Sequence, residues 1–383
     1  ATRLCHPQST KVDKYGAMST PIFQTATFDQ PTSTTFGEYD YSRSGNPTRT
    51  VLEEQMAGLD GATRSFAFAS GMAAISTMLR LVPTGGRVVT GDDIYGGTSR
   101  LLERIAPSLG IRVSHVDMCD LGAVEAALGP GDLKADLVIL ETPTNPRLQI
   151  TDIAGVARAA HAAGALCAVD NSVMAPLFQR PLELGADIVM TSATKFIAGH
   201  SDVTGGILSV QGQALADKVA FIQNAEGTAL GPFDCWLSLR GLKTMAVRME
   251  RQQANAARLA RFLDGHPLVK RVNYPGLPAH PGHALHTTQA SGPGSILSFE
   301  TADVEASKRI VEGTELFKIT VSFGSTSSLI SLPCFMSHAS IPAEVRAARG
   351  LPDDLVRISA GLEDAEDLCA DLERVMGPGG QGV

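Results

Sequence analysis

The stretch Ser192-Ala193-Thr194-Lys195-Phe196 comes just after the apolar run Asp187-Ile188-Val189-Met190 and decides how the chain is interpreted. The apolar run predicts a buried strand, so Lys195 is expected just beyond the carboxyl end of that strand. Burying an amine is costly unless it is neutralised, paired or covalently used. A lysine on the surface at a strand end is the alternative that this stretch alone leaves open.

Strand and helix patterns alternate through the region from residue 60 to residue 210. Near-continuous apolar strands separated by helices are typical of a mainly parallel sheet with both faces covered. Helices are expected near residues 71–82, 97–109, 122–129 and 152–163, and strands at Arg87–Thr90, Leu137–Leu140, Leu166–Val169, Ile188–Met190 and Ile207–Val210.

Polar residues follow three of these strands, at Glu141–Asn145, Asp170–Ser172 and Ser192–Lys195. In such sheets ligands bind beyond the carboxyl ends of the strands. The coincidence predicts one shared site at this edge of the sheet.

The pattern changes after residue 232. One long helix is expected over Cys235–Leu263, followed by a smaller α/β domain with strands at Ile296–Phe299, Ile319–Ser322 and Leu355–Ser359 and helices near 303–312 and 363–376. The first residues show no clear periodicity. We therefore expect an extended arm at 1–45 that contributes to a neighbouring subunit, a large domain at 46–234 and a smaller C-terminal domain at 235–383.

The composition is that of a globular protein, since 44% of the 383 residues are hydrophobic and 19% are charged. The net charge of −8 argues against a general nucleic-acid surface. The six cysteines are scattered without metal-ligand spacing, which indicates reduced thiols and no metal site. No apolar stretch is long enough to span a membrane. No secretory signal is recognised, and the start at Ala1 leaves a trimmed and a processed N-terminus equally open.

The residues around Lys195 suit chemistry with pyridoxal phosphate (PLP). A Schiff base gives the lysine a use, and the hydroxyls of Ser192 and Thr194 can hold a phosphate nearby. Asp170 can pair with a protonated pyridine nitrogen, although a helix cap is its ordinary alternative. Ser70-Gly71-Met72 opens an expected helix, where free amides attract an anion.

Three further side chains are candidates, each with an ordinary structural alternative. Tyr95 could stack on a cofactor ring, or be a buried tyrosine. Arg43, beside Tyr41, could bind a phosphate, or the segment could be an ordinary surface turn. Arg357 lies inside a strand pattern. It could bind a planar carboxylate, which suits its forked geometry, or it could form a structural ion pair.

These segments together resemble the Cys/Met-metabolism family of PLP-dependent enzymes over almost the whole chain. The resemblance implies a fold-type-I, aspartate-aminotransferase-like architecture: an α/β large domain with a mainly parallel seven-stranded sheet, plus a smaller C-terminal α/β domain. It also implies a homotetramer built as a dimer of active dimers. The motifs that carry it are Tyr41–Arg49, Ser70–Ala74, Glu141–Pro146, Val169–Asn171, Ser192–Lys195 and Gly199–Asp202.

The C-terminal third is most similar to the plant-type cystathionine β-lyase branch of this family. The segments that carry this likeness are Ala225–Thr228, Pro232–Trp236, Val321–Ser325, Pro333–Arg346 and Leu355–Gly361. Cystathionine γ-lyases and γ-synthases typically have a glutamate where this chain has Val321. Methionine γ-lyases typically have a cysteine where it has Gly97.

The resemblance assigns roles to the candidate residues. Lys195, Tyr95 and Ser322 would be catalytic, with Lys195 the Schiff-base lysine. Arg357, Ser322 and Asn145 would bind the substrate. The PLP ligands would be Tyr41 and Arg43 from the neighbouring subunit together with Gly71, Met72, Tyr95, Asn145, Asp170, Ser192, Thr194 and Lys195.

The implied reaction is PLP-dependent β-elimination of L-cystathionine to homocysteine, pyruvate and ammonia in methionine biosynthesis. The implied location is the plastid (chloroplast) stroma, with the cytoplasm as the alternative. A γ-lyase or γ-synthase of the same family stays open. A dinucleotide-binding oxidoreductase is disfavoured because no GxGxxG opens a helix after the first strands. A silent binding protein is disfavoured by the combination of Lys195, Asp170 and Arg357.

Overall fold

The computed structural model describes residues 1–6, 15–129, 134–337, 339, 344, 346 and 349–377. Its first sheet has seven strands in the order β1-β7-β6-β5-β4-β2-β3. Strands β2 to β6 pair in parallel, whereas β7 runs antiparallel to both of its neighbours. The predicted fold class is confirmed. The strands are β1 (Arg64–Phe68), β2 (Arg87–Gly91), β3 (Arg112–Val116), β4 (Leu137–Glu141), β5 (Leu166–Asp170), β6 (Ile188–Ser192) and β7 (Gly206–Val210).

Both faces of this sheet are buried, as the near-continuous apolar strands predict. In β4, Leu137 and Ile139 share an apolar cluster with α3, α4 and α8, whereas Val138 and Leu140 share one with α5 and α6. The helices around this sheet are α2 (Pro47–Asp60), α3 (Gly71–Leu79), α4 (Gly96–Arg104), α5 (Leu121–Leu128), α6 (Ile153–Ala162), α7 (Ala175–Phe178) and α8 (Gln213–Glu226), with short 3₁₀ turns η1 (Ala106–Leu109) and η3 (Pro181–Leu184).

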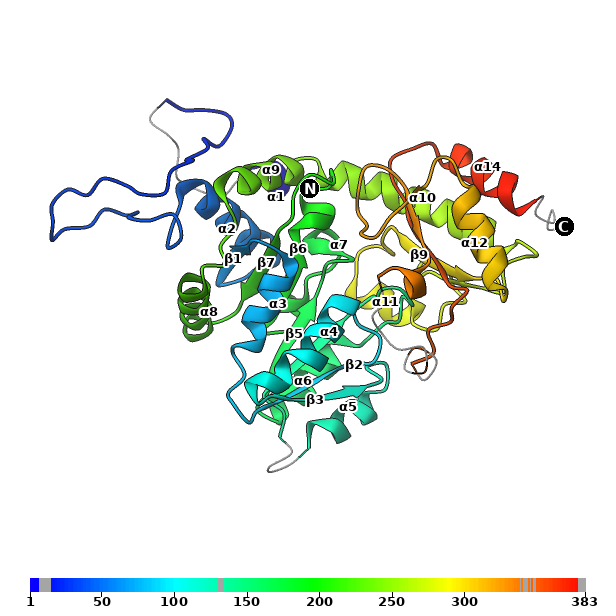
Figure 1. The fold of residues 1–383 in the computed structure, drawn as a ribbon, viewed down its shortest axis with the longest axis horizontal. Helices are drawn as coiled ribbons and strands as arrows, with labels where there is room; N and C mark the ends of the chain where they lie inside the picture. Colours follow the sequence, from blue (N-terminus) through cyan, green and yellow to red (C-terminus); the bar gives the residue numbers. More distant parts are fainter. Residues whose placement is uncertain are drawn as a thin grey trace.

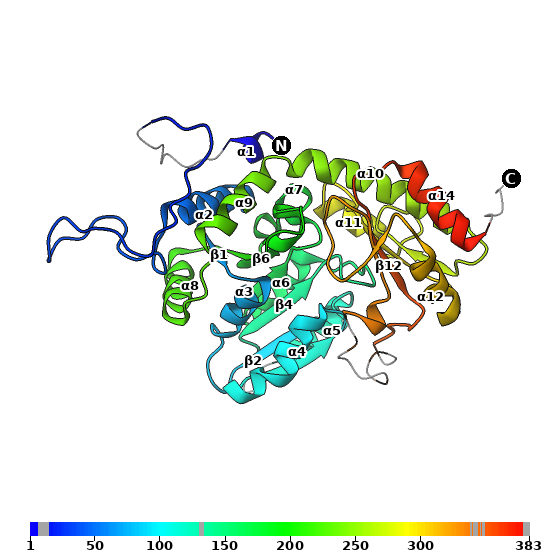
Figure 2. The ribbon, with the colours of Figure 1, turned by 45° about the horizontal axis from the view of Figure 1, so that its top comes forward.

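A second sheet has five strands in the order β10-β11-β12-β9-β8. Its core is shared with α10 (Met245–Asp264), α12 (Val304–Gly313) and α14 (Ala365–Met376). Figures 1 and 2 show α10 running along the top of the molecule toward the side that holds this sheet. The remaining elements are β8 (Arg271–Asn273), β9 (Ile296–Glu300), β10 (Lys318–Ile319), β11 (Leu329–Ser331), β12 (Val356–Ser359), α11 (His283–Gln289) and η5 (Pro333–Phe335).

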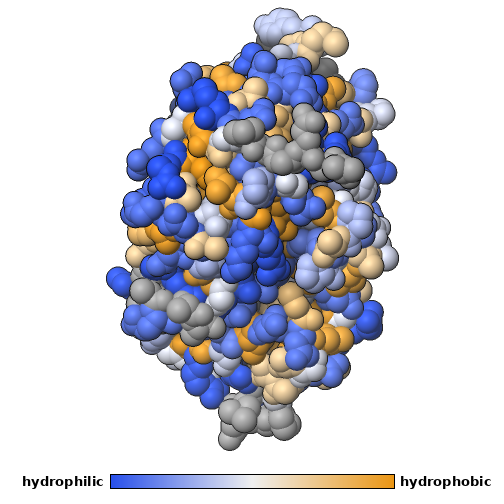
Figure 3. Space-filling view, turned by 90° about the vertical axis from the view of Figure 1, so that its right-hand side faces the viewer, coloured by the Kyte–Doolittle hydropathy of each residue, from blue (hydrophilic) through white to orange (hydrophobic). Residues whose placement is uncertain are grey.

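The outer face on this side mixes hydrophilic and hydrophobic side chains (Figure 3). Hydrophobic residues are interspersed among hydrophilic ones across the view. Among the described residues, no helix has the length and apolar character needed to cross a membrane.

Three expected elements are wrong. The helix expected near 97–109 ends at Arg104, and Ala106–Leu109 forms the separate 3₁₀ turn η1, which begins at a proline-containing step. The single helix over Cys235–Leu263 is divided into α9 (Pro232–Leu242) and α10. The break lies at Thr244, whose φ of −111° and ψ of 2° are not helical, and Arg248 donates to the carbonyl of Gly241 at 2.8 Å and so satisfies an acceptor at the end of α9. The strand over Ile319–Ser322 stops at Ile319, since Ser322 has a φ of 83°, in the left-handed region.

The N-terminal part between residues 15 and 45 holds turns and isolated bridges, while α1 (Thr2–Cys5) lies before it. Figure 1 shows this segment extending away from both sheets. Its root is fixed by the buried Arg49, which donates to the carbonyls of Ser42 at 2.7 Å and Arg43 at 3.1 Å. The division into an arm and two domains remains a proposal.

Candidate active site

Lys195 lies in the turn Ala193–Ile197 that follows β6, at a kink where its own backbone is not helical (φ −87°, ψ −125°). Its Nζ donates to the Ser322 hydroxyl at 2.6 Å and lies 4.8 Å from the centre of the Phe323 ring. Burial and the neighbouring charge of Arg357 lower the pKa of Lys195 to about 8, while Asp170 acts in the opposite direction. The amine therefore loses its proton more readily than an ordinary lysine, so a larger share of it is in the neutral form that can attack a carbonyl or accept a proton.

Two contacts hold this turn against the rest of the large sheet. The buried Arg248 on α10 donates to the Phe196 carbonyl at 2.9 Å, immediately after the lysine. The Thr194 hydroxyl accepts the backbone N–H of Gly205 at 3.0 Å, immediately before β7. The backbone on both sides of Lys195 is thus fixed by other elements.

Asp170 ends β5, next to β6 in the sheet, and is only 8% exposed. Its Oδ1 accepts the backbone N–H of Ser172 at 2.9 Å, and the Ser172 hydroxyl accepts that of Ser192 at 2.8 Å. Burial raises the pKa of Asp170, whereas the Ser172 hydrogen bonds and the charge of Lys195 lower it. The carboxyl ends of these two strands are joined as the sequence predicts.

Arg357 reaches this edge from β12 of the second sheet. Its Nη1 donates to Asn145 Oδ1 at 2.9 Å and its Nη2 to the Ser322 carbonyl at 2.6 Å. Its Nε has no hydrogen-bond partner among the described residues, although the side chain is 2% exposed. Burial lowers the pKa of Arg357 to about 10. A buried guanidinium with a free donor is suited to a carboxylate ligand.

Ser322 joins the two halves of the site. Its hydroxyl accepts from Lys195, which follows β6 of the first sheet, and its carbonyl accepts from Arg357 on β12 of the second, at a residue with left-handed backbone. Neighbouring Val321 is 50% exposed. A non-glycine residue with this φ is strained, and such strain is common at functional sites.

Tyr95 caps the start of α4 and is 38% exposed. A side chain at Gly97 would overlap the Tyr95 ring, and its Cβ would lie 2.9 Å from Met72 Sδ. The absence of a side chain at Gly97 therefore makes space for the Tyr95 ring and for the side chain of Met72.

A cradle of backbone and hydroxyl groups lies at the start of α3, where Gly71 faces Ser192. A Cβ at Gly71 would lie 3.4 Å from the Ser192 hydroxyl oxygen, so the glycine leaves the space beside that hydroxyl open. The Ser70 hydroxyl caps the helix by accepting the N–H of Ala73 at 3.0 Å. A helix N-terminus next to a serine hydroxyl favours an anion.

Tyr41 and Arg43 are the predicted site residues that one chain does not bring to this cluster. Arg43 is exposed and donates to the Asn224 carbonyl on α8 at 3.2 Å, and its guanidinium lies 5.4 Å from the centre of the Tyr41 ring. No hydrogen bond joins either residue to Lys195 in the part of the chain that the structure describes.

Three residues of the site were not given a role from the sequence: Glu141, Ser172 and Phe323. Glu141 and Ser172 stand in the polar stretches after β4 and β5, so their positions were available as a signal. Phe323 also lies 5.9 Å from the Arg357 guanidinium, and it follows Ser322 directly. An aromatic ring between two cations has no signature in the sequence itself.

The geometry fits PLP. The cradle at Gly71 and Ser192 suits its phosphate, Asp170 suits its ring nitrogen, and the pKa of Lys195 suits a covalent attachment. Among the described residues there is no group of three or more His, Cys, Asp or Glu side chains that could hold a metal ion. The fold and the site thus define a PLP-dependent enzyme of the fold-type-I class.

Comparison with known proteins gives the family. The model of the Cys/Met metabolism PLP-dependent enzyme family matches residues 1–377, and the chain belongs to this family. It is 60% identical to the chloroplastic cystathionine beta-lyase of Arabidopsis thaliana over 95% of this chain and 78% of that protein. It is 57% identical to the chloroplastic cystathionine beta-lyase of Mimosa pudica over 96% of this chain and 80% of that protein.

The fold is shared with a solved structure of the same family. A cystathionine gamma-lyase from Lactobacillus plantarum, complexed with L-serine, has a TM-score of 0.94 and 41% identity, covering 97% of each chain. The chain is therefore similar both to enzymes named cystathionine beta-lyase and to one named cystathionine gamma-lyase, so the overall fold does not distinguish the two reactions.

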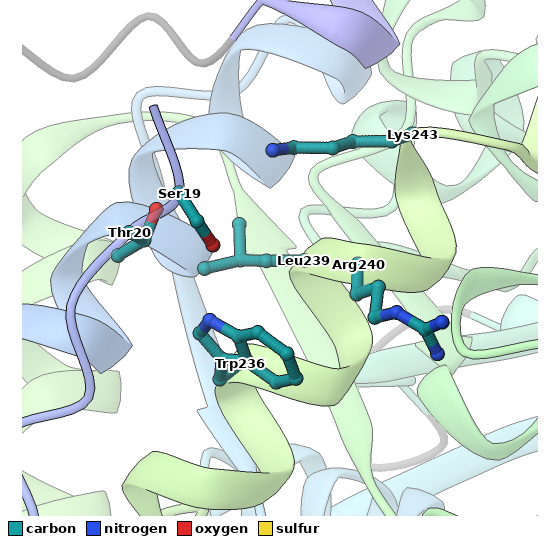
Figure 4. A pocket seen from close by; sticks show the side chains of 6 residues that line it. All are labelled: Ser19, Thr20, Trp236, Leu239, Arg240 and Lys243. Carbon is teal, nitrogen blue, oxygen red and sulfur yellow. The ribbon is translucent and has the colours of Figure 1, made fainter. Parts of the chain in front are cut away.

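A surface pocket lies apart from this site (Figure 4). Ser19 and Thr20 of the N-terminal segment face α9, and the pocket is lined by Ser19, Thr20, Trp236, Leu239, Arg240 and Lys243. None of these residues belongs to the Lys195 cluster, so this pocket is not the PLP site.

Proposed function

We propose that the enzyme catalyses β-elimination of L-cystathionine, which takes up water and gives homocysteine, pyruvate and ammonia. The observation that carries the proposal is the partly buried contact set of Lys195, Ser322 and Arg357, which places a reactive amine beside a guanidinium suited to a carboxylate. The two plant relatives named cystathionine beta-lyase support the choice of substrate.

Arg357 binds the substrate α-carboxylate through its Nη groups and its unpaired Nε, with Asn145 keeping the guanidinium in place. This orients the Cα–H bond toward Lys195 Nζ. Lys195 would hold PLP covalently in the resting enzyme, and its Nζ, once free, would take the Cα proton of the bound substrate. PLP, when bound, supplies the electron sink that stabilises the resulting charge.

The other side chains hold the ring and move the second proton. Asp170 would hold a proton on the ring nitrogen of PLP, Tyr95 would pack against that ring, and Tyr95 or Lys195 would give a proton to the departing sulfur. Ser322 accepts a hydrogen bond from Lys195 and so aims its Nζ at the substrate.

The phosphate of PLP is bound by the amides of Gly71 and Met72 and by the hydroxyls of Ser192 and Thr194. Tyr41 and Arg43 complete this site from a second copy of the chain. Exposed apolar side chains on the extended segment, such as Met18 at 97% and Phe36 at 68%, support a contact with another subunit. We propose a dimer that shares its sites, assembled further into a tetramer.

The enzyme is proposed to act in the plastid, in methionine biosynthesis. The support is the word chloroplastic in the names of both plant relatives. Imaging a fluorescent fusion of the full-length gene product tests the location: plastid signal is expected, and a cytoplasmic signal would contradict it.

Incubation of the purified enzyme with L-cystathionine, followed by product identification, tests the reaction. Homocysteine and pyruvate are expected in equal amounts. Cysteine and 2-oxobutyrate as the main products would contradict β-elimination and support the γ-lyase alternative, to which the Lactobacillus plantarum enzyme gives weight.

A further inference from the structure

Glu141 lies within the site, but the proposed chemistry gives it no role. It ends β4, pairs in register with Asp170 on β5, and is 5% exposed. Burial, and then the charge of Asp170, raise the pKa of Glu141 well above its ordinary value. A buried carboxylate is costly unless its oxygens are satisfied, so the groups that it contacts indicate its purpose.

Each oxygen of Glu141 accepts one backbone N–H from a different loop. Oε2 accepts the N–H of Tyr95 at 3.0 Å, and Oε1 accepts the N–H of Asn145 at 2.8 Å. Tyr95 lies at the start of α4, and Asn145 lies in the loop after β4. One side chain thus joins two loops that come from different strands of the sheet.

Both loops carry side chains with a proposed role. The Tyr95 ring stacks on the cofactor, whereas Asn145 Oδ1 accepts from Arg357 Nη1 at 2.9 Å. The charge of Glu141 also favours the charged form of Arg357, since it raises the pKa of Arg357 against the effect of burial. The cofactor-stacking and carboxylate-binding parts of the site therefore share one anchor.

We propose that Glu141 is a positioning residue, whose carboxylate fixes the separation between the loops of Tyr95 and Asn145. This sets the alignment of the substrate carboxylate, held by Arg357, with the cofactor ring under Tyr95. A small misplacement of the reacting groups lowers the rate of reaction strongly, so a residue that fixes their separation can matter without touching the substrate. The inference rests on the proposed function of this site.

The test compares Glu141→Gln with Asp371→Asn in the holoenzyme. Glutamine keeps the size of Glu141 but offers one acceptor oxygen, so one of the two N–H groups loses its partner. Asp371 is the control, because it is 7% exposed and accepts the backbone N–H groups of Glu315 and Leu316 at 2.9 and 2.8 Å in the second sheet's domain, although it also pairs with Arg374 at 2.6 Å. Its variant makes the same chemical change away from Lys195.

The first readout is amide hydrogen exchange in the peptides that contain Tyr95 and Asn145, and the second is kcat and KM for L-cystathionine. Glu141→Gln is expected to raise exchange at one or both amides by roughly tenfold and to lower kcat/KM by roughly 100-fold. Asp371→Asn is expected to leave both quantities unchanged. Unchanged exchange in Glu141→Gln, or equal losses in the two variants, would overturn the proposal.

The wild-type enzyme provides a measurement that does not depend on the folding of a variant. Its Tyr95 and Asn145 amides are expected to exchange slowly, and exchange at the rate of free amides would overturn the proposed anchor. A wild-type enzyme that releases no homocysteine would count against the proposed function only, since the exchange comparison still measures how Glu141 holds the loops.

Discussion

The cluster around Lys195 and the N-terminal segment are built in opposite ways. Asp170 is 8% exposed and Asn145 and Arg357 are 2% exposed, and each has its contacts within one chain. In the N-terminal segment, Met18 is 97% exposed and Tyr41 is 42% exposed. The difference teaches that one chain brings Lys195, Ser322 and Arg357 together by itself, whereas it leaves Tyr41 and Arg43 outside this cluster, where the proposed phosphate role would need a second copy.

The largest effect is expected from Lys195→Ala. Loss of the covalent anchor and of the proposed Cα base should lower the rate of pyruvate release by roughly 10⁴-fold or more. Circular dichroism should show the wild-type fold, because the lysine is not part of the apolar core. A purified variant with near wild-type turnover would rule out the assignment of Lys195.

Arg357→Lys is expected to have the second largest effect. The charge remains, but a lysine cannot reproduce the fork that contacts Asn145 and the Ser322 carbonyl. We expect kcat/KM to fall by roughly 100-fold, mainly through KM. Arg374→Lys, at an exposed arginine paired with Asp371 and Glu315, is the control that should leave the kinetics unchanged. Equal kinetics for both variants would contradict a substrate contact.

Mixing inactive variants tests the contribution of the second copy. In a random mixture of Lys195→Ala and Arg43→Ala subunits, half of the dimers are mixed and each has one intact site, so about a quarter of the wild-type activity should return. The measurement is turnover after subunit exchange, with exchange verified by mass spectrometry. Verified exchange without recovered activity would place the whole phosphate site in one chain.

Substitution at Val321 is expected to change the ratio of the products. Valine keeps the position beside Ser322 apolar, which we take to favour β-elimination. Val321→Glu should lower homocysteine release several-fold and add a γ-product, whereas Val321→Leu should keep the wild-type product ratio. The two variants are compared by chromatography of the 2-oxo acids. Identical ratios in both would remove Val321 from the selectivity.

The smallest effect is on the stability of the enzyme without cofactor. Lys195 has a pKa of about 8 in the folded chain against 10.5 ordinarily. Below about pH 8 Lys195 is protonated in both states, but only the folded state buries the charge, which lowers its stability. Between about pH 8 and pH 10.5 the amine loses its proton in the folded state and keeps it in the unfolded state. Wild-type stability should therefore gain with pH in this window relative to Lys195→Met.

Thermal unfolding of the two cofactor-free proteins across this pH window measures the effect. The advantage of the methionine variant should be largest at the acidic end and shrink as the pH rises. An advantage that is constant with pH would show that the Lys195 amine is not desolvated.

The sequence predicted the contacts that follow from regular elements. Lys195 and Asp170 come directly after apolar strands, and parallel strands bring such ends together at one edge. The pairing of Arg357 with Asn145 could not be predicted in this way, because it joins two sheets through residues 212 positions apart. Ser322 was expected to continue a strand, since nothing in its residue type announces its left-handed backbone.

The same limit applies to the long helix and to Glu141. The apolar pattern continues across the break between α9 and α10, and neither the non-helical backbone of Thr244 nor the contact of Arg248 with the Gly241 carbonyl can be recognised from it. The glutamate was recognised as one of several polar residues after β4. Its two backbone contacts depend on how the loops of Tyr95 and Asn145 meet in space.

The most direct test of the account is to identify the residue that carries PLP. The holoenzyme is treated with borohydride, which makes the bond between lysine and cofactor permanent, and its peptides are mapped by mass spectrometry. The account predicts that the phosphopyridoxyl mass lies on Lys195 alone. The same mass on another lysine, or on none, would contradict it.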